Sequence, residues 1–318
     1  MSGEGALKGE TGIGRVLVTG GAGFIGSHVV KALTNARLRV VVFDSLSTGS
    51  EQNLGLEGRS NLEFIRGDIL DGGKLSEALR SVDSVVHLAA QVSVQESVRN
   101  PAFTYKVNVD GTKNLLNESL ESGIKKFVFA STCAVYGDSR RLPITEGSPR
   151  RPLSPYADSK VKAEKACRSL ARGFARGLTI LRFFNVYGPR QERSAYANVI
   201  TKFVGRLSAD RKLVTYGDGR QTRDFVHVHD VADAILLALK RDGTTDVYNV
   251  GSGRETSVNG LAKMMSDIVG PDARGLVHAQ SKGGEVRRSW ADVSKARDVL
   301  EFSAKVSLEE GLRGILKD

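Results

Sequence analysis

The sequence predicts an α/β fold with a doubly wound parallel sheet and a smaller C-terminal lobe. Short apolar runs, typical of buried parallel strands, alternate with helical periodicity up to residue 184. A glycine-rich turn joins the first of these runs to the first helical stretch. After residue 184 the elements become shorter, beginning with a break at residues 188–190. We expect two late segments to form the lobe together, because this pattern does not fit a separate C-terminal domain.

The predicted strands are short apolar runs, many of them rich in β-branched residues. They comprise residues 15–19, 38–43, 61–66, 84–88, 126–130, 179–184 and 247–250. The helical stretches between them comprise residues 27–35, 74–80, 101–121, 156–172 and 231–239. Because helices alternate with strands, we expect helices on both faces of the sheet. Residues 251–318 are predicted to be irregular with short helices.

Length and composition fit this fold class. The chain has 318 residues, of which 40% are hydrophobic and 26% are charged. These numbers predict a sizeable core and about two domains. There is no apolar run of about 18 residues, so no membrane span is predicted. Residues 1–14 are glycine-rich and have no apolar stretch, and we interpret them as a flexible leader that is not a secretory signal.

Charge, cysteines and histidines narrow the functional classes. The net charge of +10 favours solubility or attraction of anionic small molecules over nucleic-acid binding, because the basic residues are dispersed. Only two cysteines, Cys133 and Cys167, are present, which excludes a disulfide framework and fits a reducing cytoplasm. His227 and His229 fit one face of a strand, but no third ligand type lies nearby in sequence. We therefore predict no metal site.

The first glycine turn has the spacing of a dinucleotide site. Gly20, Gly23 and Gly26 lie between a predicted strand and a predicted helix. Glycine permits the tight turn and the close approach of a pyrophosphate, whose charge the helix N-terminus favours. Asp44 ends the second strand 18 residues after Gly26, where its carboxylate can accept ribose hydroxyls and repel a 2′-phosphate. No arginine follows immediately, so we predict a Rossmann domain that prefers NAD to NADP.

Two other strand ends are candidate cofactor contacts. Asp68 is placed at the end of the third strand, within reach of an adenine ring. Ala89 and Ala90 follow the fourth strand, where small side chains let the backbone pass close to a cofactor.

Tyr156 and Lys160 form the candidate catalytic pair. Their spacing of four residues places them on one face of a predicted helix. We expect the Lys160 ammonium to lower the pKa of Tyr156 from about 10 toward neutrality, because a positive charge favours the phenolate. Such a tyrosine is a general base for a hydroxyl proton. Ser131 and Thr132 end the fifth strand at the ligand-binding edge, where the Thr132 hydroxyl is expected to hold the substrate oxygen or relay its proton.

Six motifs occur in order and together resemble one protein family. They are residues 19–26 (TGGAGFIG), 44–49 (DSLSTG), 131–137 (STCAVYG), 156–160 (YADSK), 182–189 (RFFNVYGP) and 223–228 (RDFVHV). The chain resembles the extended short-chain dehydrogenase/reductases that act on nucleotide sugars. Within them it is most similar to UDP-glucose (UDP-galactose) 4-epimerases. The resemblance covers residues 15 to about 315, nearly the whole chain.

The resemblance implies a reaction that recycles its cofactor. In this family a tyrosine takes the proton of the sugar 4-hydroxyl while the C4 hydride passes to NAD. The 4-keto sugar then turns and takes the hydride back on its other face. Carried over, Tyr156 is the base, Lys160 binds the nicotinamide ribose and Thr132 hydrogen-bonds O4. The implied cofactor contacts are Gly20, Gly23, Phe24, Ile25, Gly26, Asp44, Ser45, Ser47, Thr48, Gly49, Asp68, Ile69, Leu88, Ala89, Ala90, Asn108, Ser131, Tyr156 and Lys160.

The resemblance also implies the substrate contacts and the domain bounds. Arg223 matches a diphosphate clamp, and Lys282 stands where epimerases usually carry arginine, a loss for which Arg287 or Arg288 could compensate. Ser289 bounds the sugar pocket and leaves room for a 2-acetamido group. The full implied set is Thr132, Tyr156, Asn185, Asn198, Arg223, Lys282 and Ser289. The NAD-binding domain would comprise residues 15–184 and 226–250, and the nucleotide-sugar lobe residues 185–225 and 251–318.

The predicted function is 4-epimerisation of UDP-glucose and UDP-galactose, with the N-acetylated UDP-hexosamines as a further hypothesis. Cys133 and Ala134 replace the Asp-Glu pair of 4,6-dehydratases, and Ala134 also replaces a glutamate of UDP-glucuronate decarboxylases. The alternatives are another nucleotide-sugar enzyme of this scaffold (a dehydratase, or a UDP-glucuronate decarboxylase or 4-epimerase) and a non-catalytic NAD sensor. The resemblance further implies a homodimer packed through helices at about 101–120 and 156–172. No nucleic acid or membrane partner is expected.

Overall fold

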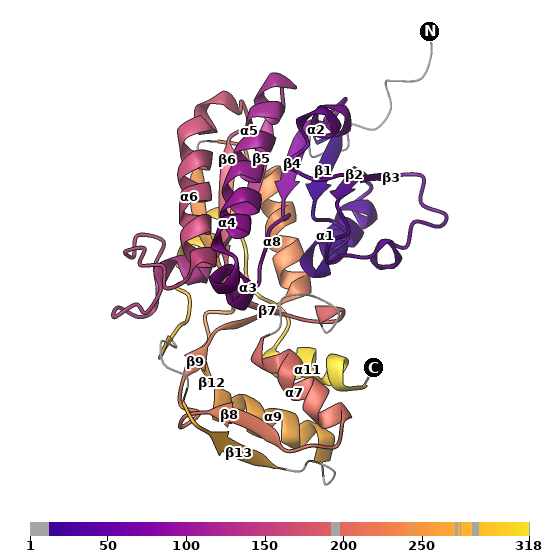
Figure 1. Cartoon of the computed structure of the whole chain (residues 1–318). Coiled ribbons are helices and arrows are strands. Elements are labelled where there is room, and N and C mark those ends of the chain that lie inside the picture. Colours follow the sequence, from indigo (N-terminus) through magenta and orange to yellow (C-terminus); the bar gives the residue numbers. More distant parts are fainter. Residues whose placement is uncertain are drawn as a thin grey trace.

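A computed structural model gives the structure of the protein. It describes residues 13–191, 198–243, 245–270, 273, 275–281 and 286–317. Most of the first half of the chain and helix α8 form the upper part of Figure 1, while α7, β8, α9, β13 and α11 form the lower part. In the described residues, no helix is long and apolar enough to cross a membrane.

A seven-stranded parallel sheet forms the centre of the upper part. Its order is β11-β6-β5-β4-β1-β2-β3, and every neighbouring pair is parallel. The strand order reverses at β1, which lies between β4 and β2, and such a switch point opens a crevice at the carboxyl edge. The predicted fold class is confirmed. The strands are β1 (Arg15–Thr19), β2 (Arg39–Asp44), β3 (Leu62–Arg66), β4 (Ser84–His87), β5 (Lys126–Thr132), β6 (Leu178–Phe183) and β11 (Asp246–Val250).

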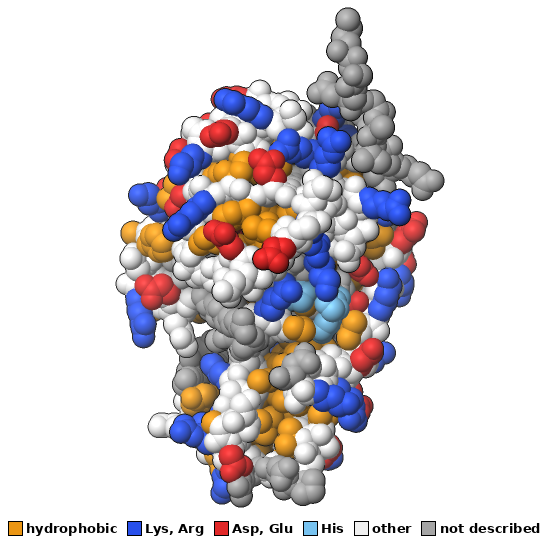
Figure 2. All heavy atoms as spheres, turned by 90° about the vertical axis from the view of Figure 1, so that its right-hand side faces the viewer, with side chains coloured by type: hydrophobic (Ala, Val, Ile, Leu, Met, Phe, Trp, Pro, Cys, Tyr) orange, Lys and Arg blue, Asp and Glu red, His pale blue; other side chains and the backbone are white. Residues whose placement is uncertain are grey.

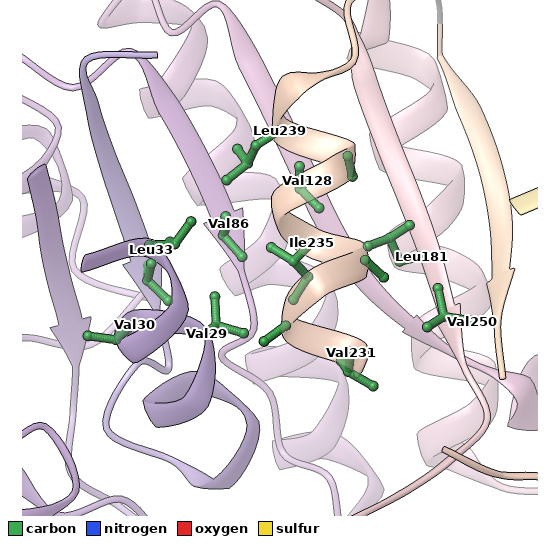
Figure 3. Close-up of a cluster of buried hydrophobic side chains, with 14 of the residues drawn as sticks. Val29, Val30, Leu33, Val86, Val128, Leu181, Val231, Ile235, Leu239 and Val250 are labelled. Atoms are coloured by element: carbon green, nitrogen blue, oxygen red, sulfur yellow. The ribbon is translucent and has the colours of Figure 1, made fainter. Parts of the chain in front are cut away.

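Helices cover both faces of this sheet because its strands are apolar on both sides. In β1, Val16 and Val18 pack into one core and Leu17 into the other. The first core lies under α1 (Phe24–Asn35), α8 (Val228–Lys240) and α10 (Ser294–Leu300). Figure 3 shows valine, leucine and isoleucine side chains of α1 and α8 against those of β4, β5, β6 and β11. The second core lies under α2 (Gly72–Ala78), α5 (Gly111–Glu121) and α6 (Pro155–Leu170).

The helix predicted over residues 101–121 is continuous but not uniform. It begins as α4 (Pro101–Tyr105), passes through a π-helical turn, η2 (Lys106–Asp110), and continues as α5. A short helix before it, α3 (Val94–Arg99), was not predicted, because its six residues are too few for a clear apolar period. The short 3₁₀ turns are η1 (Glu51–Asn53), η3 (Cys133–Tyr136) and η4 (Ala171–Gly173).

In its described residues, the lower part is built on three two-stranded sheets and three helices. Its core contains Tyr187, Phe203, Phe225, Leu261 and Met265. Residues 251–318, expected to be irregular with short helices, contain the helix α9, which runs for 12 residues with buried Leu261 and Met265. The elements are β7 (Asn185–Tyr187), α7 (Val199–Ser208), β8 (Leu213–Tyr216), β9 (Thr222–Arg223), β10 (Phe225–His227), β12 (Thr256–Ser257), α9 (Val258–Val269), β13 (Leu276–Ala279) and α11 (Leu308–Lys317).

Candidate active site

The glycine turn between β1 and α1 requires glycine at two positions. Gly20 has φ +69°, and a Cβ there would lie 2.7 Å from the backbone nitrogen of Ala89. A Cβ on Gly26 would lie 2.1 Å from the Gly20 oxygen. Gly20 therefore lets the turn pass close to the end of β4, and Gly26 lets α1 pack against the turn.

The N-terminus of α1 fits an anionic group. Gly23 is its N-cap residue, and α1 has no side-chain cap and no acidic residue in its first turn. A Cβ on Gly23 would meet only the Gly20 oxygen, at 3.3 Å, so the space beside it is otherwise open. The first N–H groups of a helix have no partner within the helix. The turn, with Phe24 and Ile25 after it, therefore fits the pyrophosphate of a dinucleotide.

Asp44 connects the end of β2 to this turn. One carboxylate oxygen accepts the Ala22 N–H at 2.9 Å, and the other accepts the Leu46 N–H at 2.8 Å. Burial raises the pKa of Asp44, and the two hydrogen bonds oppose the rise. Each oxygen keeps a second lone pair, so the group can also accept ribose hydroxyls. Arg66 lies opposite Asp44 in the β2–β3 register, so a preference for NAD requires the buried acid to outweigh this cation.

The other predicted cofactor contacts follow the neighbouring strands. Ser45 and Gly49 are half-buried after β2, whereas Ser47 and Thr48 are exposed. Asp68 does not end the third strand, because β3 stops at Arg66. Its exposed carboxylate accepts the Leu70 N–H, and Ile69 between them is buried.

The sequence did not predict a buried chain of hydrogen bonds that lies at the end of β4. His87 lies 2.7 Å from the Thr19 hydroxyl and 2.9 Å from the Thr112 hydroxyl. Thr112 donates its own proton to the Asn108 carbonyl, so His87 Nε2 donates to Thr112 and Nδ1 accepts from Thr19. Burial lowers the pKa of His87 to about 3, so the ring is neutral. The predicted contacts Leu88, Ala89 and Ala90 follow directly, half-buried, and the Ala89 N–H also reaches Thr19.

Asn108 joins the loop after β4 to the helix of the catalytic pair. It lies in the π-helical turn and is 1% exposed, so its amide needs internal partners. Its oxygen accepts the Gln91 N–H at 2.7 Å, and its nitrogen donates to the Gln91 carbonyl and the Ser159 hydroxyl, both at 2.9 Å. Ser159 in turn donates to the Tyr156 carbonyl. Asn108 therefore links the loop after β4 to α6, and it also remains a predicted cofactor contact.

The structure brings Tyr156, Lys160 and Thr132 together at the carboxyl end of β5. Ser154 caps α6 and Pro155 is its first residue, so Tyr156 lies in the first turn. The Tyr156 hydroxyl hydrogen-bonds Thr132. Lys160 donates to the Ala130 carbonyl at 2.9 Å.

The expected acidification of Tyr156 is wrong for the protein alone. Burial raises the pKa of Tyr156 to about 12, and the hydrogen bond from Thr132 opposes this only in part. Lys160 is not among the groups that shift it. The lysine is itself buried, which lowers its pKa to about 8, and its ammonium is held by a backbone carbonyl. Sequence spacing placed the two side chains on one face but did not fix the direction of the ammonium.

A buried ion pair lies beside the catalytic pair. Arg182 of β6 is 1% exposed and Glu164 of α6 is 0% exposed. The guanidinium donates to both carboxylate oxygens, at 2.8 and 2.6 Å. Ser131, a predicted cofactor contact, donates its hydroxyl to the same carboxylate at 2.6 Å. Sequence reasoning missed this pair, because Glu164 and Arg182 lie on different elements and no local spacing connects them.

Arg223, the predicted diphosphate clamp, is the last residue of β9 and is held by hydrogen bonds to the backbone. Its guanidinium donates to the Thr222 and Val286 carbonyls at 2.7 and 2.8 Å, and its charge acts on the Cys133 thiol next to Thr132. Asn185 donates its amide to the Asp224 carbonyl at 3.1 Å. The structure therefore places Arg223 near the catalytic end of β5.

Asp224 fixes the neighbourhood of Arg223. Its side chain is 0% exposed and accepts two bonds from Ser252, at 2.7 Å each, one from the Gly253 N–H at 3.0 Å and one from the Ala291 N–H at 3.1 Å. Burial raises the pKa of this carboxyl, and the hydrogen bonds oppose the rise. Sequence reasoning did not select this residue.

The remaining predicted substrate contacts divide into three cases. Asn198 caps α7, accepting two N–H groups and donating to the Val186 carbonyl. Ser289 is buried. Lys282 lies outside the described residues. Its proposed substitutes are already paired, Arg287 with Asp218 at 2.7 Å and Arg288 with Glu255 at 2.8 Å.

Three histidines meet where the two parts of the molecule join. His227 ends β10, while His229 lies in α8, so they do not share a strand as expected. Their ring centroids are 4.7 Å apart, and His28 of α1 lies 5.1 Å from His229. Figure 2 shows histidine side chains at this level beside lysine and arginine. In the parts of the chain that the structure describes, no group of three His, Cys, Asp or Glu residues could hold a metal ion.

Known proteins are similar to this chain in both fold and sequence. It is similar to a UDP-N-acetylglucosamine 4-epimerase from Methanobrevibacter ruminantium M1, solved in complex with UDP-N-acetylmuramic acid, with 37% identity and a TM-score of 0.90 over 96% of this chain and 97% of that one. It is similar to a UDP-glucose 4-epimerase from Thermotoga maritima, solved with UDP-glucose, with 40% identity and a TM-score of 0.88 over 95% and 97%. A dTDP-D-glucose 4,6-dehydratase from Mus musculus is 40% identical over 262 residues, 80% of this chain and 73% of that protein.

A family model described as the NAD dependent epimerase/dehydratase family matches residues 16–251. The matched segment contains the glycine turn, Asp44 and the Tyr156–Lys160 pair. The expected cofactor, NAD, is confirmed by this match.

Proposed function

Because this chain belongs to the NAD dependent epimerase/dehydratase family, we propose that it interconverts UDP-glucose and UDP-galactose at C4. The relatives show that the protein is an enzyme of the nucleotide-sugar 4-epimerase/dehydratase type. One observation carries the finer proposal. Thr132, which hydrogen-bonds Tyr156, is followed by Cys133 and Ala134, so the turn η3 begins without a carboxylate.

Epimerisation needs one base, whereas eliminating water from a sugar also needs an acid for the leaving hydroxyl. Cys133 is the titratable group of the turn η3 that lies nearest Tyr156. Burial raises the pKa of its thiol to about 12, so the thiol stays neutral and is a poor proton donor near pH 7. This favours epimerisation over dehydration for this chain, although a dehydratase is among its relatives.

The protein's own residues would divide the work as follows. Tyr156 takes the proton of the sugar hydroxyl, and Thr132 holds the same oxygen. Because burial raises the pKa of Tyr156 to about 12, the lone protein does not ionise this phenol, and nearby positive charge is needed to do so. Lys160 does not shift this pKa in the protein alone and would hold the nicotinamide ribose, so the positive charge would come from the nicotinamide ring of bound NAD. NAD, when bound, accepts and returns the hydride at C4.

Arg223 would hold the substrate diphosphate. Its position near Cys133 brings a guanidinium close to the catalytic end of β5, and a guanidinium can bind two phosphate oxygens. We further propose contacts from Asn185 and Asn198, whose amides each keep an N–H beyond the hydrogen bonds described above. Lys282 is proposed as a second phosphate contact, since Arg287 and Arg288 are already paired with carboxylates.

A second substrate class is favoured by Ser289. Serine is small, and the similar protein from Methanobrevibacter ruminantium M1 is a UDP-N-acetylglucosamine 4-epimerase. We propose that the pocket also accepts UDP-N-acetylhexosamines. A Ser289→Tyr variant should then lose the acetylated sugars more than the plain ones. An unchanged ratio of the two turnover rates would contradict this part of the proposal.

The proposed reaction is tested with a panel of UDP-sugars followed by proton NMR. Equilibration of UDP-galactose with UDP-glucose is the expected result, with Tyr156→Phe as the inactive control. Carbon dioxide released from UDP-glucuronate, or a 4-keto-6-deoxy product from UDP-glucose or dTDP-glucose, would replace the proposal with a decarboxylase or a dehydratase. NAD binding without turnover of any sugar would indicate a sensor.

We also propose a homodimer and a cytoplasmic location. Val98 of α3, Phe103 of α4 and Leu153 before α6 are 64%, 47% and 59% exposed, and α3 and α4 pack on α6. Exposed large apolar side chains favour burial against a second copy. Light scattering after size-exclusion chromatography should give twice the chain mass, and Val98→Glu should halve it.

Two free cysteines fit a reducing compartment, which localisation of a tagged chain would test.

A further inference from the structure

The buried pair of Glu164 and Arg182 is larger than a single ion pair. Arg182 also donates to the Tyr136 hydroxyl at 2.8 Å and to the Glu146 carbonyl at 3.0 Å. Tyr136 donates to Asn249 of β11 at 2.6 Å. The network thus joins α6, β5, β6 and β11 on the side of the sheet that carries the catalytic helix. Its charged atoms are satisfied by hydrogen bonds, as buried charges must be.

Glu164 lies one helical turn after Lys160, which lies one turn after Tyr156. Position 164 therefore continues the row of side chains that faces β5. At that strand the Glu164 carboxylate accepts the Ser131 hydroxyl, and Ser131 directly precedes Thr132. The carboxylate therefore contacts the strand that carries Thr132 and stands on the helix that carries Tyr156 and Lys160.

The surroundings of Lys160 contain one carboxylate that supports its charge. In the described residues, burial lowers the pKa of Lys160, while Cys167 and then Glu164 from its own helix raise it; His87 of β4 also lies within range of its charge. His87 is neutral, and burial also keeps the Cys167 thiol protonated by raising its pKa. Facing Glu164 are Arg182 from β6, Ser131 from β5 and Arg150, 3.5 Å away, from the segment before α6. Without Glu164, the buried Arg182 guanidinium would lose its carboxylate partner, and Lys160 would lose the carboxylate that helps to raise its pKa.

We propose that Glu164, held by Arg182, is a positioning residue for the catalytic pair: it fixes α6 to β5 through Ser131 and supplies the negative charge beside the Lys160 ammonium. This inference rests on the proposed function insofar as it concerns catalysis. Its electrostatic part concerns the protein alone. A purely structural brace would hold the helix in place without changing the protonation of Lys160.

The test compares Glu164→Gln with the double variant Glu164→Gln/Arg182→Gln. The single change keeps the shape but leaves Arg182 unpaired, whereas the double change removes both charges. The exposed pair Glu309–Arg313 on α11 supplies the matched control, Glu309→Gln. In each protein the titration of Lys160 is followed by NMR of labelled lysine side chains, assigned with Lys160→Met. Epimerase rate is measured over the same pH range.

We expect Glu164→Gln to move the Lys160 midpoint down by about one pH unit or more, since two buried cations repel each other. The alkaline limb of kcat should move with it, at little change in KM. The double variant should return the midpoint most of the way, and Glu309→Gln should leave it in place. An unmoved midpoint in folded Glu164→Gln, or a double variant no better than the single one, would overturn the inference.

Two outcomes separate this inference from the proposed reaction. If the parent protein turns over no sugar while the midpoint moves as expected, the reaction fails and the electrostatic role stands. If Glu164→Gln does not fold, a Glu164→Asp variant takes its place, because it keeps the charge on a shorter arm. In that case we expect the midpoint to stay near that of the parent while kcat falls, and a normal kcat would count against positioning.

Discussion

A buried lysine lies at each end of strand β5. Lys126 begins the strand and is 2% exposed, and its ammonium donates to the Arg241 carbonyl, the Thr179 hydroxyl and the Arg176 carbonyl. Lys160 reaches the carboxyl end from α6 and is 4% exposed. Burial lowers the pKa of both to about 8. By titration alone the two lysines are alike.

Their surroundings differ. Lys126 uses all three of its protons on protein oxygens, beside a cavity of about 100 Å³ that is also lined by Asp242, Asp246 and Tyr248. Lys160 lies at the carboxyl edge with Tyr156, where a doubly wound sheet binds its ligands. A depressed lysine pKa therefore marks burial, and position in the fold decides which lysine is catalytic.

The largest expected effect is that of removing the base at the carboxyl end. Tyr156→Phe should lower kcat by about 1,000-fold, within the range expected for loss of a general base. The fold and NAD binding should be retained, because the ring stays in place. Coupled assay of UDP-galactose conversion and fluorescence titration of NAD would check both. A variant as fast as the parent would remove Tyr156 from the mechanism.

Next comes the direct comparison of the two lysines. Lys160→Met should reduce kcat by about 100-fold. Lys126→Met should leave kcat within about twofold but cost about 1–3 kcal/mol of unfolding free energy, because one buried and two partly buried oxygens lose their donor. Turnover and urea denaturation on both variants provide the measurement. Equal losses of turnover would mean that the two ends are not functionally distinct.

The third prediction separates activity from stability by pH. Lys160 loses its proton as pH rises through about 8 in the folded protein, so turnover should fall about tenfold by pH 9. The unfolded chain keeps that proton up to the ordinary lysine pKa of 10.5, so it binds more protons and the contribution of both lysines to stability rises over this window. We expect the melting temperature not to fall between pH 7 and 8.5. A melt that falls in parallel with activity would assign the loss to unfolding.

The smallest effect is expected at Asp44, which lies at the same edge of the sheet but away from the reacting atoms. Asp44→Asn should weaken NAD binding by about fivefold, since a charged acceptor becomes a neutral one. It should weaken NADP binding less, or strengthen it, because Arg66 would then face a 2′-phosphate without the acid. Calorimetry with both nucleotides gives the ratio. A ratio equal to that of the parent would mean that Asp44 does not select the cofactor.

The sequence was informative where a pattern repeats or where a motif is local. Short apolar runs predicted all seven strands of the main sheet to within about two residues at each end, and spacing alone indicated Gly20, Gly26 and the Tyr156–Lys160 pair. These features depend on neighbouring residues, which a single chain displays directly. The same reasoning merged α4, η2 and α5 into one helix, because residues 106–110 contain no glycine or proline that would mark the change to π-helical hydrogen bonds.

The buried polar partners could not be predicted in this way. Glu164 and Arg182 are 18 residues apart, and Thr19 and His87 are 68 apart. No local period connects such residues, since they meet only after the sheet has formed. The direction of the Lys160 ammonium toward the Ala130 carbonyl is likewise set by tertiary packing. Burial of Tyr156, which also follows from tertiary packing, raises its pKa, so the predicted direction of the pKa shift was wrong.

The Asp224 carboxylate has a practical consequence for redesign. Through Ser252, Gly253 and Ala291 it fastens together stretches of chain that are far apart in sequence. These stretches carry Arg223, which is proposed to hold the diphosphate, and Ser289, which is proposed to bound the sugar pocket. If only one of these stretches were replaced by that of a relative, its hydrogen-bond donors would no longer match the buried Asp224 carboxylate. Variants designed for other sugars should therefore have all of these stretches replaced together.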